Sequence, residues 1–224
     1  MCKYSETVNY WDKVFGEEAP AFAVSQPFPF PEIETGLKWV CQRSRRIVDF
    51  GCGNGHVLLR CLSLGVDEGI GIDISPSAVS LATCTAHSSG LADRATFVTG
   101  SVSQLKAMQD CSVDAVVLFN IVDNMLPSDA RLLIEEVRRI TMPEGRILLK
   151  LNDHYSNSFL IDSDEHEELS AGFYREATGL YLWNLSNEDI ASILAADLKV
   201  EQSFRVEFKQ HNAWNRLYFI RRCV

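Results

Sequence analysis

The sequence lacks an excess of basic residues. Among 224 residues, 21 Lys and Arg stand against 30 Asp and Glu, which gives a formal net charge of −9. A protein whose main task is to bind phosphate backbones needs a basic surface. The charge balance therefore disfavours nucleic acid as a partner, and it is compatible with a small-molecule substrate.

The sequence also lacks an apolar run of about 20 residues, the length that a membrane helix needs. Its first residues do not have the basic-then-apolar pattern of a secretory signal. The seven cysteines are odd in number and have no C-x-x-C spacing, which disfavours a disulfide framework or a zinc site. We expect a cytoplasmic protein with reduced thiols, no membrane contact and no bound metal, and its oligomeric state stays open.

Strands and helices alternate from residue 45 onward, and no internal repeat interrupts them. Such alternation predicts a parallel sheet with helices on both faces. The expected strands are residues 45–50, 69–74, 95–99, 113–119 and 146–151. Residues 200–208 and 217–224 form a hairpin, which makes the last strand antiparallel. The predicted fold is a doubly wound, Rossmann-like α/β domain with a seven-stranded, mostly parallel sheet.

Two segments lie outside this alternation. Residues 1–37 are expected to form a helical strap that covers the core or closes over a ligand. The strap cannot be one continuous helix, because prolines stand at positions 27, 29 and 31. Residues 152–184 are expected to be an insertion with a helix of its own that serves as a substrate lid. We therefore expect one domain over 1–224, with the core at 45–151 and a last helix and hairpin at 185–224.

The most informative motif follows the first strand. The strand carries Asp49 near its end, and Gly51, Gly53 and Gly55 then alternate before a helix begins. Glycines at such a turn let the backbone bend sharply and let a ligand approach it. Asp73 ends the second strand, where a carboxylate can accept hydrogen bonds from both hydroxyls of a ribose.

A dinucleotide-binding protein shares part of this pattern. Its G-x-G-x-x-G fingerprint would require a glycine where His56 stands, and the sequence instead reads D-x-G-x-G-x-G. The alternating turn after an acidic residue fits a ligand whose amino-acid portion carries an ammonium and a carboxylate. A nicotinamide-dependent oxidoreductase stays as an alternative.

Taken together, these motifs resemble those of the class I S-adenosylmethionine-dependent methyltransferases. The resemblance spans about residues 45–151, and the last forty residues are similar in topology. It implies S-adenosylmethionine as the cofactor and S-adenosylhomocysteine as the product. It also implies that Asp73 holds the ribose, that Ile74 lies beside the adenine, and that the methionine part is bound by Asp49, Gly51, Cys52, Gly53 and Gly55.

The same resemblance implies four further cofactor-binding positions. Ser101, followed by Val102, stands where the family usually has an acidic residue near the adenine amino group, and a hydroxyl can still accept that hydrogen bond. Asn120 and Ile121 end the fourth strand and should flank the methionine chain. We add Trp11 of the strap to the cofactor-binding set.

Methyl transfer needs alignment more than acid–base chemistry, because the methyl group of a sulfonium is already activated. A hydroxyl or protonated amine acceptor would also need a base. His154 is the preferred candidate and Asp153 the second, since both follow the fifth strand; the alternative is that His154 is a solvent-exposed loop residue. The predicted reaction is methyl transfer to an O, N or S atom of a small molecule.

Other functions stay open. The chain could bind the cofactor without catalysing transfer and act as a partner or regulator, or it could methylate a protein or an RNA. The acid–amide pairs Asp123-Asn124 and Asn152-Asp153 could supply oxygen ligands to a metal ion, but such pairs are common in loops. No Pro-Cys nucleophile and no Asn/Asp-Pro-Pro-Tyr motif follows the fourth strand, which disfavours a base-directed nucleic-acid enzyme.

Overall fold

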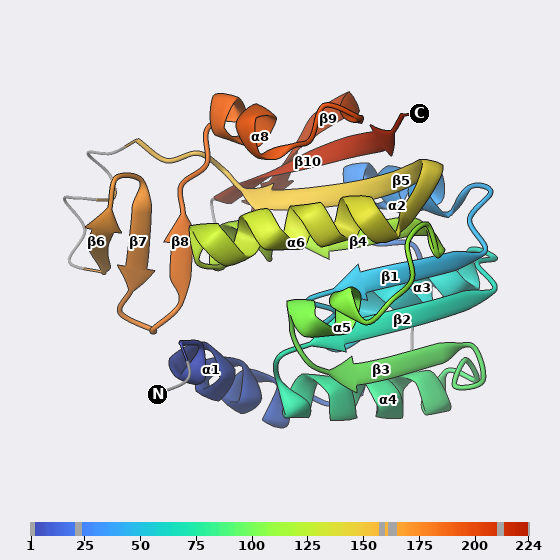
Figure 1. The fold of residues 1–224 in the computed structure, drawn as a ribbon. Coiled ribbons are helices and arrows are strands. Elements are labelled where there is room, and N and C mark those ends of the chain that lie inside the picture. Colours follow the sequence, from blue (N-terminus) through green and yellow to red (C-terminus); the bar gives the residue numbers. More distant parts are fainter. Residues whose placement is uncertain (1–2, 21–23, 157–159, 161–164, 210–212, 224) are drawn as a thin grey trace.

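The computed structural model describes residues 3–20, 24–156, 160, 165–209 and 213–223. At its centre is a seven-stranded sheet in the order β3-β2-β1-β4-β5-β10-β9 (Figure 1). Five strands run parallel, and β10 runs antiparallel to β5 and β9. This confirms the predicted fold class. The strands are β1 (Arg46–Phe50), β2 (Glu68–Asp73), β3 (Ala95–Thr99), β4 (Val113–Phe119), β5 (Thr141–Asn152), β9 (Leu198–Phe208) and β10 (Ala213–Arg222).

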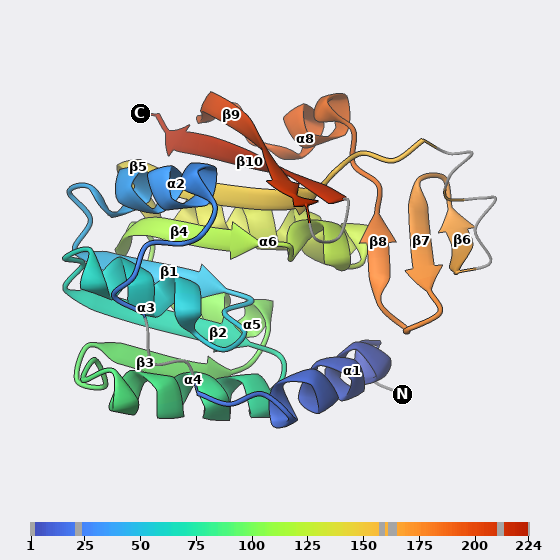
Figure 2. The same cartoon turned by 180° about the vertical axis from the view of Figure 1, so that it is seen from behind.

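Both faces of the sheet are covered by helices, so each face has its own apolar core. One face carries α5 (Val102–Lys106), α6 (Pro127–Ile140) and α8 (Asn187–Ile193), which lie in front of the sheet in Figure 1. The opposite face carries α2 (Pro31–Cys41), α3 (His56–Ser63) and α4 (Pro76–Ser88), which come forward in Figure 2. Burial on both sides explains why the central strands read as almost continuous apolar runs.

The described residues of the N-terminal segment include one helix and the beginning of a second. Helix α1 (Ser5–Gly16) crosses the edge of the sheet at which the parallel strands end, as Figures 1 and 2 both show. Helix α2 begins at Pro31, because proline is well suited to the first helical position. Its residues Leu37 and Val40 are fully buried in the second core. The N-terminal segment therefore combines a covering helix with part of the core.

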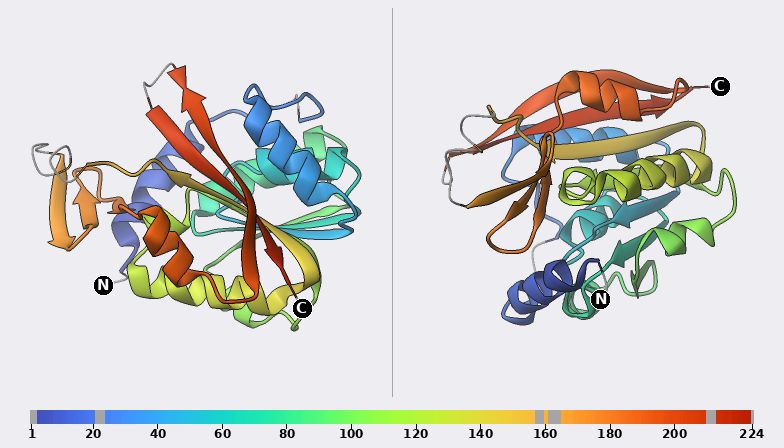
Figure 3. Two further views of the ribbon diagram at one scale, coloured as in Figure 1. Left: turned by 90° about the horizontal axis from the view of Figure 1, so that it is seen from above. Right: turned by 60° about the vertical axis from the view of Figure 1, so that its left-hand side comes forward.

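The described part of the insertion is mainly a three-stranded antiparallel sheet; Leu160 is helical, and the other residues next to it lie outside the described ranges, so the helix expected in the insertion stays a prediction. The sheet contains β6 (His166–Ser170), β7 (Phe173–Glu176) and β8 (Tyr181–Trp183). Gly172 and Gly179 have φ of +72° and +83° and lie in the two hairpin turns, a requirement that glycine meets without strain. Figure 3 shows this small sheet standing beyond the carboxyl ends of the parallel strands.

The short helix η1 (Val122–Asn124) links β4 to α6 and is packed against β8. None of the helices in the described part of the chain is long and apolar enough to cross a membrane.

Candidate cofactor and acceptor site

The glycine turn between β1 and α3 has the backbone that its sequence predicts. Gly51, Gly53 and Gly55 have φ of +77°, +51° and +77°. A Cβ on Gly55 would come within 2.9 Å of both Ala82 and the ring of Phe97, so a larger residue would be strained and crowded there. The turn therefore needs glycine at these positions, and it lies between the carboxyl end of β1 and the start of α3.

Two buried carboxylates flank the turn. Asp73 accepts hydrogen bonds from Gly53 N at 2.8 Å and from Ser75 N at 2.9 Å. Asp49 is 1% exposed, and its Oδ2 has no hydrogen-bond partner among the described residues. Burial, together with the neighbouring charge of Asp73, raises the pKa of Asp49 to about 8, and burial also raises the pKa of Asp73. An unpaired buried carboxylate oxygen is costly unless a ligand satisfies it.

The helix α1 lies against the glycine turn through aromatic side chains. The Phe15 ring comes within 3.1 Å of the position that a Cβ on Gly53 would take. Trp11 stacks on Phe15, with ring centroids 5.5 Å apart. Trp11 is thus joined to the turn through Phe15, a residue that the sequence analysis did not single out.

Polar contacts hold the same end of α1 in position. Asp12 accepts hydrogen bonds from the Ser75 hydroxyl at 2.5 Å and from Ser77 N at 3.1 Å, and the Ser75 bond holds the pKa of Asp12 below its usual value. Asn54 in the turn donates to Glu18 at 2.6 Å. The covering helix is therefore tied both to the start of α4 and to the glycine turn.

The residues expected near the adenine lie at the ends of β2 and β3. Gly100 N donates to the Asp73 carbonyl at 2.8 Å, which brings Ser101 close to the second strand. Ser101 N donates to Gln104 Oε1 at 2.7 Å, and its hydroxyl lies 3.2 Å from that of Ser103. Ile74 is half-buried, and Cys52 and Val102 are buried. Their roles in cofactor binding stay predictions.

The end of β4 reaches the glycine turn from the other side. The Ile121 side chain lies 3.2 Å from the position of a Cβ on Gly51. Asn120 has φ of +52°, in the left-handed region that only glycine occupies freely and that Asn tolerates better than most residues. The turn at Asn120 therefore lies between the expected cofactor site and β5.

A polar cluster next to Asn120 was missed by sequence reasoning. Asn120 Nδ2 donates to Asn152 Oδ1 at 2.9 Å, Asn215 Nδ2 donates to the same oxygen at 3.3 Å, and Lys150 Nζ donates to Asn215 Oδ1 at 3.0 Å. Burial lowers the pKa of Lys150 to about 8. The cluster depends on the β5–β10 register, which pairs Asn152 with Asn215. The polar residues at alternate positions 150 and 152 in an otherwise apolar strand were the signal that could have found it.

The two base candidates differ in their surroundings. Asp153 accepts a hydrogen bond from Arg205 at 2.5 Å and lies 3.9 Å from Arg216, so its charge is already paired. His154 is exposed. A catalytic role for either residue stays a prediction.

Asp123, one of the oxygen ligands considered for a metal, is buried in η1. Its Oδ2 accepts a hydrogen bond from Asn152 N at 2.6 Å, and burial raises its pKa to about 6. Within the described ranges, no three His, Cys, Asp or Glu side chains are grouped as a metal site would require.

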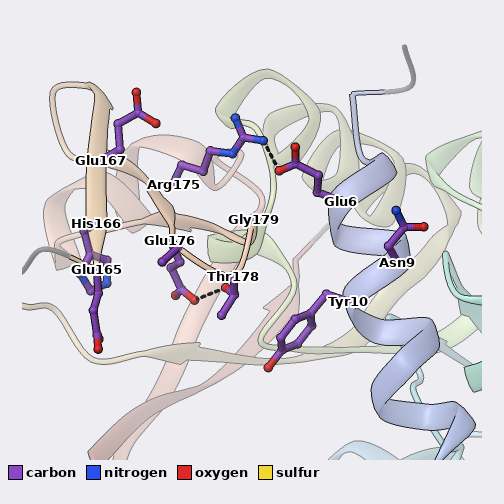
Figure 4. Close-up of a pocket in the computed structure, with 11 residues that line it drawn as sticks. Glu6, Asn9, Tyr10, Glu165, His166, Glu167, Arg175, Glu176, Thr178 and Gly179 are labelled. Carbon is purple, nitrogen blue, oxygen red and sulfur yellow. Dashed lines mark hydrogen bonds and ion pairs between the residues drawn. The ribbon is translucent and has the colours of Figure 1, made fainter.

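An open cleft of about 700 Å³ separates the first turns of α1 from the three-stranded sheet (Figure 4). Glu6 and Arg175 form an ion pair between the two sides, and the Tyr181 hydroxyl donates to the Lys3 carbonyl at 3.2 Å. Helix α1 therefore contacts the glycine turn at one end and lines this cleft at the other. The lining residues are Glu6, Asn9, Tyr10, Glu165, His166, Glu167, Arg175, Glu176, Ala177, Thr178 and Gly179.

Residues 47–145, which contain the glycine turn, Asp73 and the end of β4, match the family model of a methyltransferase domain. The match covers less than half of the chain, and it agrees with the methyltransferase family and the S-adenosylmethionine cofactor that the sequence motifs predicted.

The curated proteins that this chain resembles are named for different substrates. The chain is 29% identical over 144 residues to the ribosomal protein L11 methyltransferase of Pasteurella multocida, covering 59% of this chain and 46% of that protein. It is 24% identical over 209 residues to the tRNA N(3)-methylcytidine methyltransferase of Schizosaccharomyces pombe, covering 87% of this chain and 65% of that protein. The chain thus spans about half to two thirds of the length of these curated relatives.

Solved structures share the fold. The 1,6-didemethyltoxoflavin-N1-methyltransferase of Burkholderia thailandensis, solved with that compound and S-adenosylhomocysteine, has a TM-score of 0.69. The match covers 99% of this chain and 87% of that one at 15% identity, so the likeness shows the fold alone.

The residues at the glycine turn fit the family's cofactor. The unpartnered, buried Asp49 Oδ2 can receive a cationic group, and Asp73, which accepts hydrogen bonds from backbone N–H groups including those of Gly53 and Ser75, is a carboxylate that can also accept from a hydroxyl. Both groups favour a ligand that has an ammonium and ribose hydroxyls.

Proposed function

We propose that this protein transfers the methyl group of S-adenosylmethionine to an O, N or S atom of a small molecule. The observation that carries the proposal is the pair of buried carboxylates, Asp49 and Asp73, on either side of a turn in which Gly51, Gly53 and Gly55 have positive φ angles. When bound, the cofactor supplies an activated methyl group on a sulfonium. The protein then has to orient the acceptor and exclude water.

The proposed cofactor contacts divide by element. Asp49 and the turn would hold the methionine part, Asp73 the ribose, and residues near Ser101 the adenine. Asn120 and Ile121 would flank the methionine chain. Trp11 and Phe15 would cover the cofactor, since α1 is tied to the turn on which it would lie.

The proposed acceptor enters between α1 and the insertion, which we infer is the substrate lid. A volume of about 700 Å³ lies within the range of small-molecule sites. Four glutamates line the cleft, and its one arginine is paired with Glu6. Such a lining repels phosphate backbones, which supports a small molecule over a nucleic acid. A cytoplasmic location is part of the same proposal, and the six described cysteines are all free.

An RNA base is the second candidate. It is favoured by the tRNA methyltransferase of Schizosaccharomyces pombe, whose match extends over 87% of this chain. The net charge of −9 argues against it, because tRNA binding would have to overcome repulsion at the acidic cleft.

Methyl-labelled S-adenosylmethionine tests the proposal. The protein is incubated with the dialysable, RNA and protein fractions of a cell extract, and label and S-adenosylhomocysteine are measured in each. We expect label in the dialysable fraction and none with the Asp73→Ala variant. Label in RNA or protein would overturn the small-molecule assignment. No acceptor-dependent S-adenosylhomocysteine in any fraction would favour a non-catalytic, cofactor-binding partner.

A further inference from the structure

Four polar side chains form one hydrogen-bonded chain at the carboxyl end of β4 and β5. The chain runs from Lys150 through Asn215 and Asn152 to Asn120. Lys150 lies 5.3 Å from the centre of the Phe119 ring, on the face of the sheet that α2 covers. Asn215 is buried, whereas the other three are partly exposed. The chain therefore reaches from the interior to an accessible edge.

Lys150 determines the direction of this chain, because an ammonium group can only donate hydrogen bonds. Asn215 must turn its Oδ1 toward Lys150, which leaves its Nδ2 to donate to the Trp214 carbonyl at 2.9 Å and to Asn152 Oδ1 at 3.3 Å. That same oxygen accepts the bond from Asn120 Nδ2. Two amide atoms then have no partner among the described residues: the donor Asn152 Nδ2 and the acceptor Asn120 Oδ1.

The free ends lie next to the proposed cofactor site. Asn120 is followed directly by Ile121, whose side chain packs on Gly51 of the glycine turn. The left-handed backbone of Asn120 carries a conformational cost for a residue other than glycine, and such outliers gather at functional sites. Asn120 directly follows β4, and Asn152 ends β5, the neighbour of β4 on the side opposite β1. The two residues therefore lie at the same end of the sheet as the glycine turn.

We propose that Asn120 and Asn152 bind the methyl acceptor by one edge, and that this acceptor is a nitrogen heterocycle with adjacent hydrogen-bond donor and acceptor atoms. The inference rests on the proposed function and narrows its substrate class. A lactam N–H beside its carbonyl, or a ring nitrogen beside an amino group, complements the free amide pair. Sites built to hydrogen-bond such an edge reject analogues that lack it.

The experiment uses 2-pyridone, which has this edge, and N-methyl-2-pyridone, which lacks the donor. Each is titrated into the ¹⁵N-labelled full chain saturated with S-adenosylhomocysteine, and the Asn120 and Asn152 side-chain amide signals are followed. We expect saturable shifts with 2-pyridone and binding at least about fivefold weaker with the methylated compound, as one lost hydrogen bond predicts.

Asn152→Asp is the matched variant, because it turns the free donor into an acceptor while it keeps the oxygen that Asn120 and Asn215 need. Asn187→Asp is its control, because Asn187 Oδ1 accepts a hydrogen bond from the Tyr218 hydroxyl at 2.9 Å and is not part of the hydrogen-bonded series from Lys150 to Asn120. We expect the preference for 2-pyridone over N-methyl-2-pyridone to be lost in Asn152→Asp and kept in Asn187→Asp. The affinity for S-adenosylhomocysteine should be retained in both variants.

The inference would be overturned if the two pyridones bound equally well or if neither shifted the amide signals. It would also be overturned if Asn152→Asp and Asn187→Asp had the same preference between the pyridones. Failure of the protein to bind S-adenosylhomocysteine would instead contradict the proposed function. A competition experiment distinguishes two sources of the heterocycle. If tRNA displaces 2-pyridone more strongly per base than cytidine does, the acceptor is a base in RNA; otherwise it is a free heterocycle.

Discussion

Asp73 accepts a hydrogen bond from Gly53 N at 2.8 Å, so the carboxylate that ends β2 is joined directly to the turn that follows β1. The bond orients the carboxylate at the carboxyl edge of the sheet, where a ribose would meet it. It also links the conformation of the turn to the charge at position 73.

The first prediction concerns this carboxylate. Asp73→Ala should weaken binding of S-adenosylhomocysteine by more than about tenfold, because it removes the ribose hydrogen-bond pair. Calorimetry measures the change. Asp67→Ala is the control, since Asp67 forms only an exposed ion pair with Arg45 at the other end of β2. Unchanged affinity of the Asp73 variant would refute the map of the cofactor site.

The second prediction concerns pH and stability. The pKa of Asp49 is about 8 in the folded chain and about 3.9 in an unfolded one, so the native state binds more protons between these values. This group therefore makes the ligand-free protein less stable as pH rises from about 4 to 8. An Asn side chain at position 49 does not ionise, so it should remove this loss of stability. Asp49→Asn should melt at a higher temperature than wild type at pH 8 and approach it near pH 4, while it binds cofactor more weakly.

Melting curves over this pH range, without ligand, test the second prediction. Asp114→Asn serves for comparison, because Asp114 accepts two backbone N–H bonds at the opposite edge of the sheet. An Asp49 variant that is less stable than wild type at pH 8 would show that its carboxylate is satisfied within the protein.

The third prediction tests the covering helix. Asp12→Ala removes the bonds from Ser75 and Ser77 that tie α1 to α4. If α1 covers the cofactor, release of S-adenosylhomocysteine should become about tenfold faster, as the loss of one to two hydrogen bonds implies. Stopped-flow release gives the rate, with the variant Glu17→Ala, at the exposed residue directly after the same helix, as the reference. Equal rates in the two variants would remove α1 from the cofactor site.

The fourth prediction concerns the base. If His154 removes a proton from the acceptor, His154→Gln should lower kcat by at least about 100-fold and leave cofactor affinity unchanged. The same substitution at exposed His87 is the control. A kcat within about threefold of wild type would assign His154 to the solvent-exposed loop.

The features predicted correctly from the sequence depend on short-range patterns. The central strands are apolar because both faces are covered, and the turn at Gly51–Gly55 needs positive φ angles that a glycine pattern reveals. The places of Asp49 and Asp73 in neighbouring strands also followed, because parallel pairing brings the ends of β1 and β2 to one edge, whereas their roles in cofactor binding stay predictions.

The features that were missed depend on long-range pairing. The chain from Lys150 to Asn120 exists because β10 pairs with β5 in one register, which no local pattern specifies. Phe15 lies over Gly53 because α1 is docked on α4 through Asp12, a contact between residues far apart in the sequence. The hairpins of the insertion were missed as well, although Gly172 and Gly179 lie in their turns and could have indicated them.

The most direct test of the central claim compares two ligands by calorimetry on the full chain. The account predicts that S-adenosylhomocysteine binds with one equivalent per chain, that Asp73→Ala weakens this binding, and that NADH does not bind. Tight binding of NADH with none of S-adenosylhomocysteine would contradict it.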